Sequence, residues 1–98
     1  MVLTEARVTT TPGALAGIRV VDFTWVRAGP WGARWLGTLG AEVIKVEWPE
    51  NERGRGGGFT TPQGMEVNLN TSGQFNDTNC NKLSLTLNVR TPRGLDII

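Results

Sequence analysis

The hydrophobic pattern is strongest in the first half of the chain, where it predicts a strand, a helix and a second strand. Residues 18–23 form an apolar, β-branched run interrupted only by Arg19 and Asp22, which is typical of a parallel strand covered on both faces. Residues 42–47 form a second short run of this kind. The helix between them is expected to begin at Pro30, whose fixed φ and missing N–H suit the first helical position. Two strands joined in this way predict a parallel pair.

The predicted helix carries three large apolar residues at helical spacing. Trp31, Trp35 and Leu39 recur every four residues, so we expect the two tryptophans to pack in the core. Gly40 is suited to the left-handed conformation that closes a helix. The turn before the helix, residues 25–29, is expected at the carboxyl ends of the strands and beside a helix N-terminus, where anions bind well. This turn is the first candidate ligand site.

The second half of the chain has less pattern. Residues 48–78 are rich in glycine and predict one long loop, which either covers a ligand site or is a surface loop. The glycines within 54–58 follow no predicted strand, so they lack the context of a phosphate-binding loop. Residues 82–89 alternate between leucine or valine and polar residues, which predicts a strand with one buried face. Thr91 as N-cap and Pro92 as first residue predict the start of another helix.

These elements predict an α/β fold with a parallel sheet of about three strands, two helices and one long glycine-rich loop. The 98 residues are 39% hydrophobic, which suits one small domain or part of one. Because the last helix has only about two turns before Ile98, we expect residues 1–98 to be part of a longer fold. The net charge of +1 predicts neither nucleic acid nor a membrane surface as a partner. Without an apolar run or signal-type segment, a cytoplasmic location is expected.

The composition restricts the possible chemistry. The chain has no histidine and one cysteine, Cys80, so we expect no Cys/His metal site and no histidine-based triad, and we assign no catalytic residue. Asp22 is either a catalytic carboxylate with a raised pKa or, as we favour, a structural acceptor for loop amides. The other acidic and amide candidates are more typical of exposed strand ends and turns: Glu42, Glu47, Asp77 and Asn79.

A few side chains suggest a ligand. Arg27 precedes a helix and, with Lys45 and Arg90 near the same sheet edge, suits a phosphate or carboxylate, but a solvated arginine explains it equally well. Trp25 and Trp48 fall in predicted loops and are the better candidates for stacking on an adenine ring.

Two blocks of sequence resemble a known family. The chain reads LAGIRVVDFTWVRAGPWGARWLGTLGAEVIKVEWP over residues 15–49 and NCNKLSLTLNVRTPRGLDII over residues 79–98. In this order the blocks resemble the N-terminus of the class III CoA-transferases, the family of formyl-CoA and carnitine CoA-transferases. The related α-methylacyl-CoA racemases share these blocks, so a racemase fragment is one alternative. A CoA- or nucleotide-binding module without chemistry, or a remnant of an enzyme, is another.

The resemblance implies a Rossmann-like domain and an interlocked homodimer in the full-length protein. It implies a reaction in which CoA moves between carboxylic acids through an aspartyl acyl-anhydride and an aspartyl-CoA thioester. The substrates are then an acyl-CoA and a carboxylic acid, and no cofactor is bound permanently. The family's aspartate is expected beyond the position of Ile98, so the 98-residue chain alone is expected to be inactive.

The resemblance also implies contacts to coenzyme A. These carry over to two groups of residues, which are Val26, Arg27 and Ala28 in the first turn and Leu87, Asn88, Val89 and Arg90 after the last strand. The chain departs from the family pattern at several positions. Asn88 stands where an aspartate is frequent, Leu83 where an arginine is frequent, and Trp48 where some members have an arginine that contacts CoA. A tryptophan at that position is suited to stack on the ligand.

Overall fold

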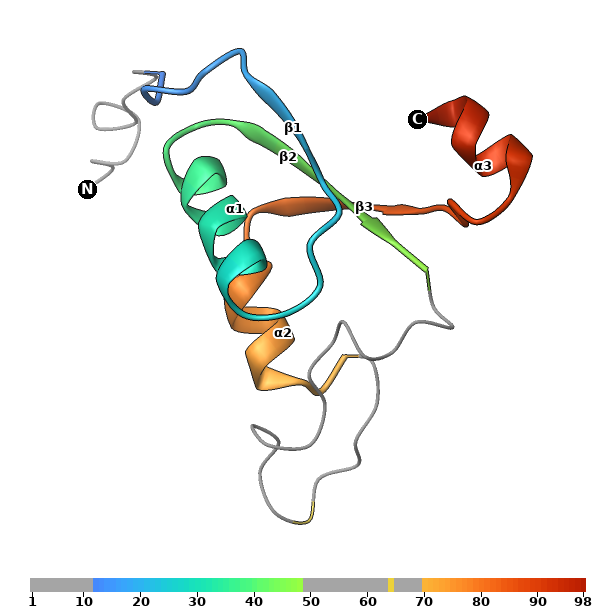
Figure 1. The fold of residues 1–98 in the computed structure, drawn as a ribbon. Helices are drawn as coiled ribbons and strands as arrows, with labels where there is room; N and C mark the ends of the chain where they lie inside the picture. The colour runs from blue at the N-terminus through green and yellow to red at the C-terminus, as the bar shows by residue number, and fades with distance from the viewer. Residues whose placement is uncertain (1–11, 49–63, 65–69) are drawn as a thin grey trace, which may run out of the picture.

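The computed structural model describes residues 12–48, 64 and 70–98. Its elements follow one another as β1 (Arg19–Asp22), α1 (Ala28–Thr38), β2 (Glu42–Glu47), α2 (Gly73–Thr78), β3 (Lys82–Thr86) and α3 (Pro92–Ile97). Figure 1 shows α1 and α2 on one side of the sheet, whereas α3 lies apart from them beyond the end of β3. The predicted α/β fold is confirmed. No helix in the described ranges is long and apolar enough to cross a membrane.

The three strands form one parallel sheet in the order β1-β2-β3. Asp22 lies opposite Lys45 in the β1–β2 register, and Val43 lies opposite Lys82 in the β2–β3 register. The predicted parallel pairing of the first two strands is therefore confirmed. Since the strands run in the same direction, their carboxyl ends meet at one edge of the sheet, where ligands commonly bind in α/β folds.

The core lies between α1 and the sheet. Val43 is 1% exposed and is packed with Ala33 and Ala41, and Leu15 and Val20 lie against this cluster. The residues of α1 that face the sheet are small, which lets the helix approach β2 closely. A Cβ on residue 37, a glycine, would lie 3.5 Å from a methyl group of Val43. The small side chains on this face therefore allow α1 to pack closely on β2.

The prediction that the tryptophans of α1 pack in the core is wrong. Trp31 and Trp35 are 43% and 48% exposed, and their rings meet edge to face with centroids 5.9 Å apart. The guanidinium of Arg34 lies 4.9 Å from the ring centroid of Trp31 and pairs with Asp77 of α2. The face of α1 toward the sheet carries small residues at the same three- to four-residue spacing as the tryptophans. These residues are Pro30, Ala33 and Gly37. Spacing alone therefore does not select which face is buried.

The face of the sheet away from α1 is open in the described residues. Val21, Ile44 and Leu83 are partners in the sheet register, so their side chains point to the same face. Val21 is 50% exposed, Leu83 is 56% exposed and Leu85 is 40% exposed. The expectations of a first strand covered on both faces and a last strand with a buried apolar face are thus wrong for these residues. The reason is that α1 packs on the other face, with α2 beside it (Figure 1).

The ends of the helices follow local rules with small shifts. Helix α1 begins at Ala28, two residues before the predicted start at Pro30, because proline is tolerated anywhere in the first helical turn. Gly40 follows α1 with φ +107°, and a Cβ there would lie 2.9 Å from the backbone of Gly13. Its predicted left-handed role is confirmed. The prediction for α3 is also confirmed, because the Thr91 hydroxyl accepts a hydrogen bond from the Gly94 N–H at 3.0 Å.

Helix α2 was not predicted, since Gly73–Thr78 lies within the predicted loop of residues 48–78. The Ser72 hydroxyl caps it by accepting a hydrogen bond from the Phe75 N–H at 3.2 Å. The sequence of α2, GQFNDT, is too short and too polar to show helical periodicity, which explains the error. Most of the predicted loop, residues 49–63 and 65–69, lies outside the described residues.

Candidate functional site

A pocket lies at the edge of the sheet where the three strands end. Its volume is about 230 Å³. Residues from the carboxyl end of each strand line it, and they are Phe23, Trp25, Val46, Glu47, Trp48, Leu87, Asn88, Val89 and Arg90. Parallel strands bring these three segments together although up to 67 positions separate them, from 23 to 90. The position is the one that α/β folds commonly use for ligands.

The lining combines aromatic surface with a few polar groups. Trp25 is 48% exposed and Trp48 is 37% exposed, so part of each indole is accessible to a ligand. The guanidinium of Arg90 supplies a positive charge and fixed donors for an anionic group. Glu47 is the one carboxylate among the lining residues of the described chain, and its Oε2 accepts a hydrogen bond from the Ser84 hydroxyl at 2.9 Å. A pocket that combines aromatic side chains with a few convergent polar groups is typical of ligand sites.

The wall of the pocket that follows β3 is held by local hydrogen bonds. The Leu87 N–H donates to the Glu47 carbonyl at 2.9 Å, which continues the pairing of β2 and β3. The side-chain oxygen of Asn88 accepts from the Arg90 N–H at 3.0 Å, and the Asn88 carbonyl accepts from the Thr91 hydroxyl at 3.0 Å. This segment is therefore a turn joined directly to the cap of α3. We call it the β3 wall, residues 87–90.

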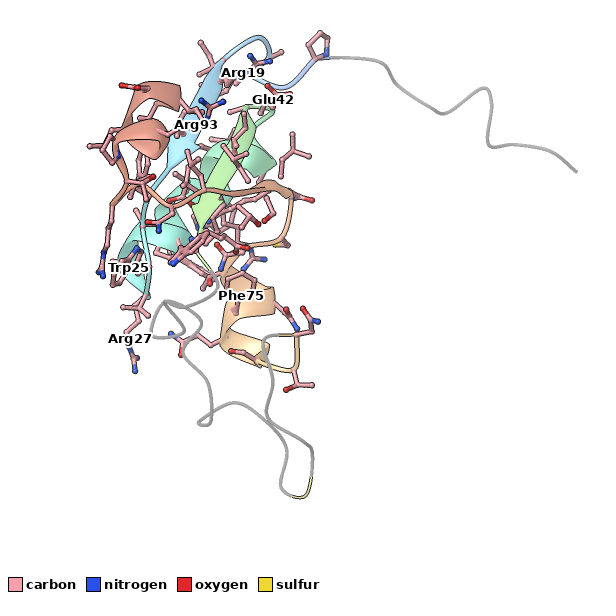
Figure 2. The ribbon with its side chains drawn as sticks, turned by 90° about the vertical axis from the view of Figure 1, so that its right-hand side faces the viewer. Arg19, Trp25, Arg27, Glu42, Phe75 and Arg93 are labelled. Atoms are coloured by element: carbon pink, nitrogen blue, oxygen red, sulfur yellow. The ribbon has the colours of Figure 1, made fainter. Side chains whose placement is uncertain are left out.

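The wall that follows β1 is a turn with an unusual backbone, and we call it the β1 wall, residues 23–30. Arg27 has φ 58° and ψ −108°, a conformation that favours glycine and costs a larger residue about 1–3 kcal/mol. Figure 2 shows its side chain extending away from the turn. The chain folds back on itself, since a Cβ on Gly29 would lie 2.6 Å from the Thr24 side chain. The Trp31 N–H then donates to the Arg27 carbonyl at 3.0 Å.

Asp22 lies beneath the β1 wall and is 2% exposed. Its carboxylate accepts hydrogen bonds from the N–H and hydroxyl of Thr24 and from Lys82 Nζ at 2.8 Å. Burial by itself raises the pKa of Asp22, but the bonds from Lys82 and Thr24 and the charge of Lys45 outweigh it, so the pKa is lowered. The carboxylate is thus ionised and fully engaged. The favoured structural role of Asp22 is confirmed.

Two buried lysines complete this network. Lys45 Nζ donates to the Thr24 carbonyl at 2.6 Å and lies 3.8 Å from the Asp22 carboxylate. Lys82 Nζ donates to Asp22, to the Pro30 carbonyl at 2.9 Å and to the Asn79 side chain at 2.8 Å. Lys45 therefore lies at the turn after β1, near the expected end of the sheet, but its side chain is buried and bound by protein acceptors, so the expectation that it joins Arg27 and Arg90 in binding an anion is wrong.

Comparison with known proteins identifies the family. The family model described as CoA-transferase family III matches residues 15–98. The chain belongs to this family. A formyl-CoA:oxalate CoA-transferase of Streptomyces avermitilis is 42% identical over 85 residues, covering 87% of the chain and 19% of the relative. A succinyl-CoA:glutarate CoA-transferase of Mus musculus is 44% identical over 85 residues, covering 86% of the chain and 18% of the relative.

Solved structures agree with the family assignment. A CAIB/BAIF family protein from Brucella suis matches with a TM-score of 0.70 and 35% identity, over 89% of the chain and 22% of that structure. A hypothetical protein from Mycobacterium tuberculosis matches with a TM-score of 0.69 and 36% identity, over 89% of the chain and 22% of that structure. The chain thus spans about a fifth of the length of these relatives, at 18–22%.

The structure brings together only part of the residues to which the family's CoA contacts carry over. The four residues after β3 all line the pocket, namely Leu87, Asn88, Val89 and Arg90. The three residues of the first turn lie on the adjoining β1 wall but do not line the pocket, namely Val26, Arg27 and Ala28. Binding by either group stays a prediction. Trp25 and Trp48, the predicted stacking residues, both line it.

Other residues of the site were missed from the sequence. Phe23 and Val46 line the pocket, and Lys82 anchors the turn beneath it. A usable signal existed for Lys82. A buried aspartate such as Asp22 needs a hydrogen-bonding or charged partner. A lysine in another predicted strand, such as Lys82, is the type of residue that supplies one.

Proposed function

We propose that this chain forms the CoA-binding N-terminal part of a CoA-transferase that moves CoA between carboxylic acids. The observation that carries the proposal is the pocket at the carboxyl ends of the strands, which joins Trp25 and Trp48 to Arg90. Family membership supports CoA as the ligand class, and we propose the pocket as its place of binding. The substrates proposed are an acyl-CoA and a carboxylic acid.

The chemistry of the lining matches the parts of CoA. An indole face stacks well on adenine, and Trp25 and Trp48 each present accessible surface. The guanidinium of Arg90 suits a phosphate through charge-assisted hydrogen bonds. We propose that Trp48 replaces an ionic contact to CoA by stacking, because some family members are expected to have an arginine at this position. Arg27, on the exposed side of the β1 wall, is proposed to contribute charge from outside the pocket.

The transfer chemistry is proposed to run through an aspartyl acyl-anhydride and an aspartyl-CoA thioester. Asp22 is an unsuitable nucleophile, because it is 2% exposed and its oxygens accept bonds from Lys82 and Thr24. The aspartate is therefore proposed to come from sequence beyond Ile98, and the 98-residue chain alone is proposed to lack transferase activity. An interlocked homodimer and a cytoplasmic location belong to the same proposal for the full-length protein.

A second candidate is a CoA-binding module without chemistry. One observation favours this candidate. Glu47, the carboxylate that lines the pocket in the described chain, already accepts a hydrogen bond from Ser84 and is therefore a poor nucleophile. The relatives compared above have the names of CoA-transferases, which supports the transferase over a racemase. An assay of CoA exchange between carboxylic acids, made with a protein that includes the downstream sequence, separates the transferase from the module. Exchange supports the transferase, and binding without exchange supports the module.

Calorimetric titration of CoA into the 98-residue chain tests the pocket itself. Arg90→Ala is expected to raise the dissociation constant about tenfold, equivalent to about 1.4 kcal/mol for one charge-assisted contact. Arg93→Ala is the matched control, because it also removes one positive charge, in this case from α3 (Figure 2). Arg93 does not line the pocket. It is expected to change the constant by less than about twofold. An unchanged constant in Arg90→Ala, or equal losses in both variants, contradicts the proposed site.

A further inference from the structure

Buried charges hold the β1 wall at two points. Lys45 of β2 binds the Thr24 carbonyl at one end of the turn, and Lys82 of β3 binds the Pro30 carbonyl at the other. Asp22 lies between the two ammonium groups, 2.8 Å from Lys82 Nζ and 3.8 Å from Lys45 Nζ. Each of these three side chains is almost entirely removed from solvent, at 6% exposure or less.

This arrangement is more demanding than a simple ion pair. An ammonium group has three donors, and Lys82 directs all three at acceptors from three separate segments, namely Asp22, Pro30 and Asn79. A buried charge is stable only where such acceptors are already in place. The two carbonyls of the turn are thus joined to strands β2 and β3 through buried charges.

The turn needs such support because of Arg27. Its backbone adopts a conformation that glycine tolerates and larger residues avoid, and such strain persists only where surrounding contacts determine it. Arg27 lies between Thr24 and Pro30, the two residues whose carbonyls the lysines bind. The two lysines therefore join the turn to β2 on one side of Arg27 and to β3 on the other.

We propose that Lys45 and Lys82 are positioning residues that clamp the β1 wall and hold Arg27 in its strained conformation. Neither lysine touches the ligand in this account. They set the place of Trp25 in the pocket and of Arg27 beside it. The part of the proposal that concerns ligand affinity rests on the proposed CoA site, whereas the part that concerns the turn stands independently of it.

Amide hydrogen exchange, followed by NMR in the 98-residue chain, tests the clamp. In Lys45→Met the N–H groups of Thr24 and Trp31 are expected to exchange about tenfold faster or more, because they bond within the released turn. The Glu42 N–H bonds to the Ile18 carbonyl at the far end of the sheet and is expected to keep its protection. Arg19→Met is the matched control, since it removes one positive charge from an exposed pair with Glu42.

A second substitution separates positioning from general stability. Arg27→Gly removes the backbone strain, so in the double variant Lys45→Met/Arg27→Gly the Trp31 N–H is expected to regain at least half of its lost protection on a logarithmic scale. The rescue is compared with the effect of Arg27→Gly alone, because for a purely structural lysine Arg27→Gly has the same effect with and without Lys45. Unchanged exchange at Thr24 and Trp31, an equal acceleration of all amides, or no rescue by Arg27→Gly overturns the proposal.

The unsubstituted chain provides a test if Lys45→Met does not fold. Buried, hydrogen-bonded ammonium groups exchange slowly enough to be observed by NMR, and those of Lys45 and Lys82 are expected to correlate with the carbonyl carbons of Thr24 and Pro30. Ammonium signals averaged with solvent overturn the clamp. The expected loss of CoA affinity in Lys45→Met is about tenfold. If the unsubstituted chain does not bind CoA, the proposed function fails, and exchange alone decides the clamp.

Discussion

The two walls of the pocket are built in different ways. The β3 wall, residues 87–90, is held by bonds between near neighbours, such as Asn88 to Arg90 and Thr91 to Asn88. The β1 wall, residues 23–30, is held by Lys45 and Lys82, whose partners lie 21 and 52 positions away in the sequence. Beyond Leu87, whose N–H pairs with the Glu47 carbonyl of β2, the β3 wall is therefore a local turn, whereas the β1 wall depends on buried side chains from β2 and β3.

The difference has an energetic consequence. A local turn loses its bonds one at a time, and each is worth about 1 kcal/mol. The buried charges under the β1 wall are coupled, because removing one leaves the others desolvated and incompletely paired. Damage to the β1 wall should therefore unfold the sheet edge as a unit, whereas damage to the β3 wall should stay local.

The largest effect is expected from Lys82→Met. The substitution keeps most of the side-chain volume but leaves Asp22 without its closest cation and the Pro30 carbonyl without a donor. The expected loss is about 3–5 kcal/mol in the free energy of unfolding, measured by urea denaturation. A loss below about 1 kcal/mol, the level of an exposed pair, contradicts the coupling described for this wall.

The pH dependence of the free energy of unfolding provides the control for this prediction. The pKa of Asp22 is lower in the folded chain than its ordinary value, so its contribution to stability is present above the unfolded pKa of about 3.9 and is lost as pH falls through the folded pKa. The difference in stability between the unsubstituted chain and Lys82→Met should therefore shrink as pH falls below about 4. A difference that does not vary with pH shows that Lys82 acts by packing alone.

A smaller effect is expected from Thr91→Ala. The substitution removes the cap of α3 and the hydroxyl bond to the Asn88 carbonyl, at an expected cost of about 1 kcal/mol in urea denaturation. Chemical-shift changes should stay within residues 87–98. The matched control is Ser72→Ala, which removes the cap of α2. It should cost a similar amount and leave CoA affinity unchanged, whereas Thr91→Ala should weaken it. Equal effects of the two variants on CoA affinity contradict a role for the β3 wall.

The sequence predicted the locally determined features well. The strand over Arg19–Asp22, the parallel pairing with Glu42–Glu47 and the Thr91–Pro92 helix start all follow from nearby residues. The resemblance to the CoA-transferase family implied the β3 wall as a binding segment, and its residues line the pocket. Its ligand stays a prediction.

The features that were missed depend on contacts between distant residues. Helical spacing did not reveal that Ala33, and not Trp31, faces the sheet, because both lie on regular stripes of the same helix. The Asp22–Lys82 pair joins residues 60 positions apart, and Lys82 looked like an ordinary polar residue of an alternating strand. Such pairing follows from the register of β1, β2 and β3, which propensity does not determine.

Chemical-shift mapping of CoA binding to the 98-residue chain tests the central claim most directly, because it shows which surface the ligand contacts. The account predicts that the largest amide and indole shifts occur at Trp25, Trp48 and Leu87–Arg90. The exposed tryptophans of α1, Trp31 and Trp35, should serve as an internal control and remain unshifted. Shifts that concentrate on those two α1 tryptophans, or no shifts at millimolar CoA, contradict a CoA site at the carboxyl ends of the strands.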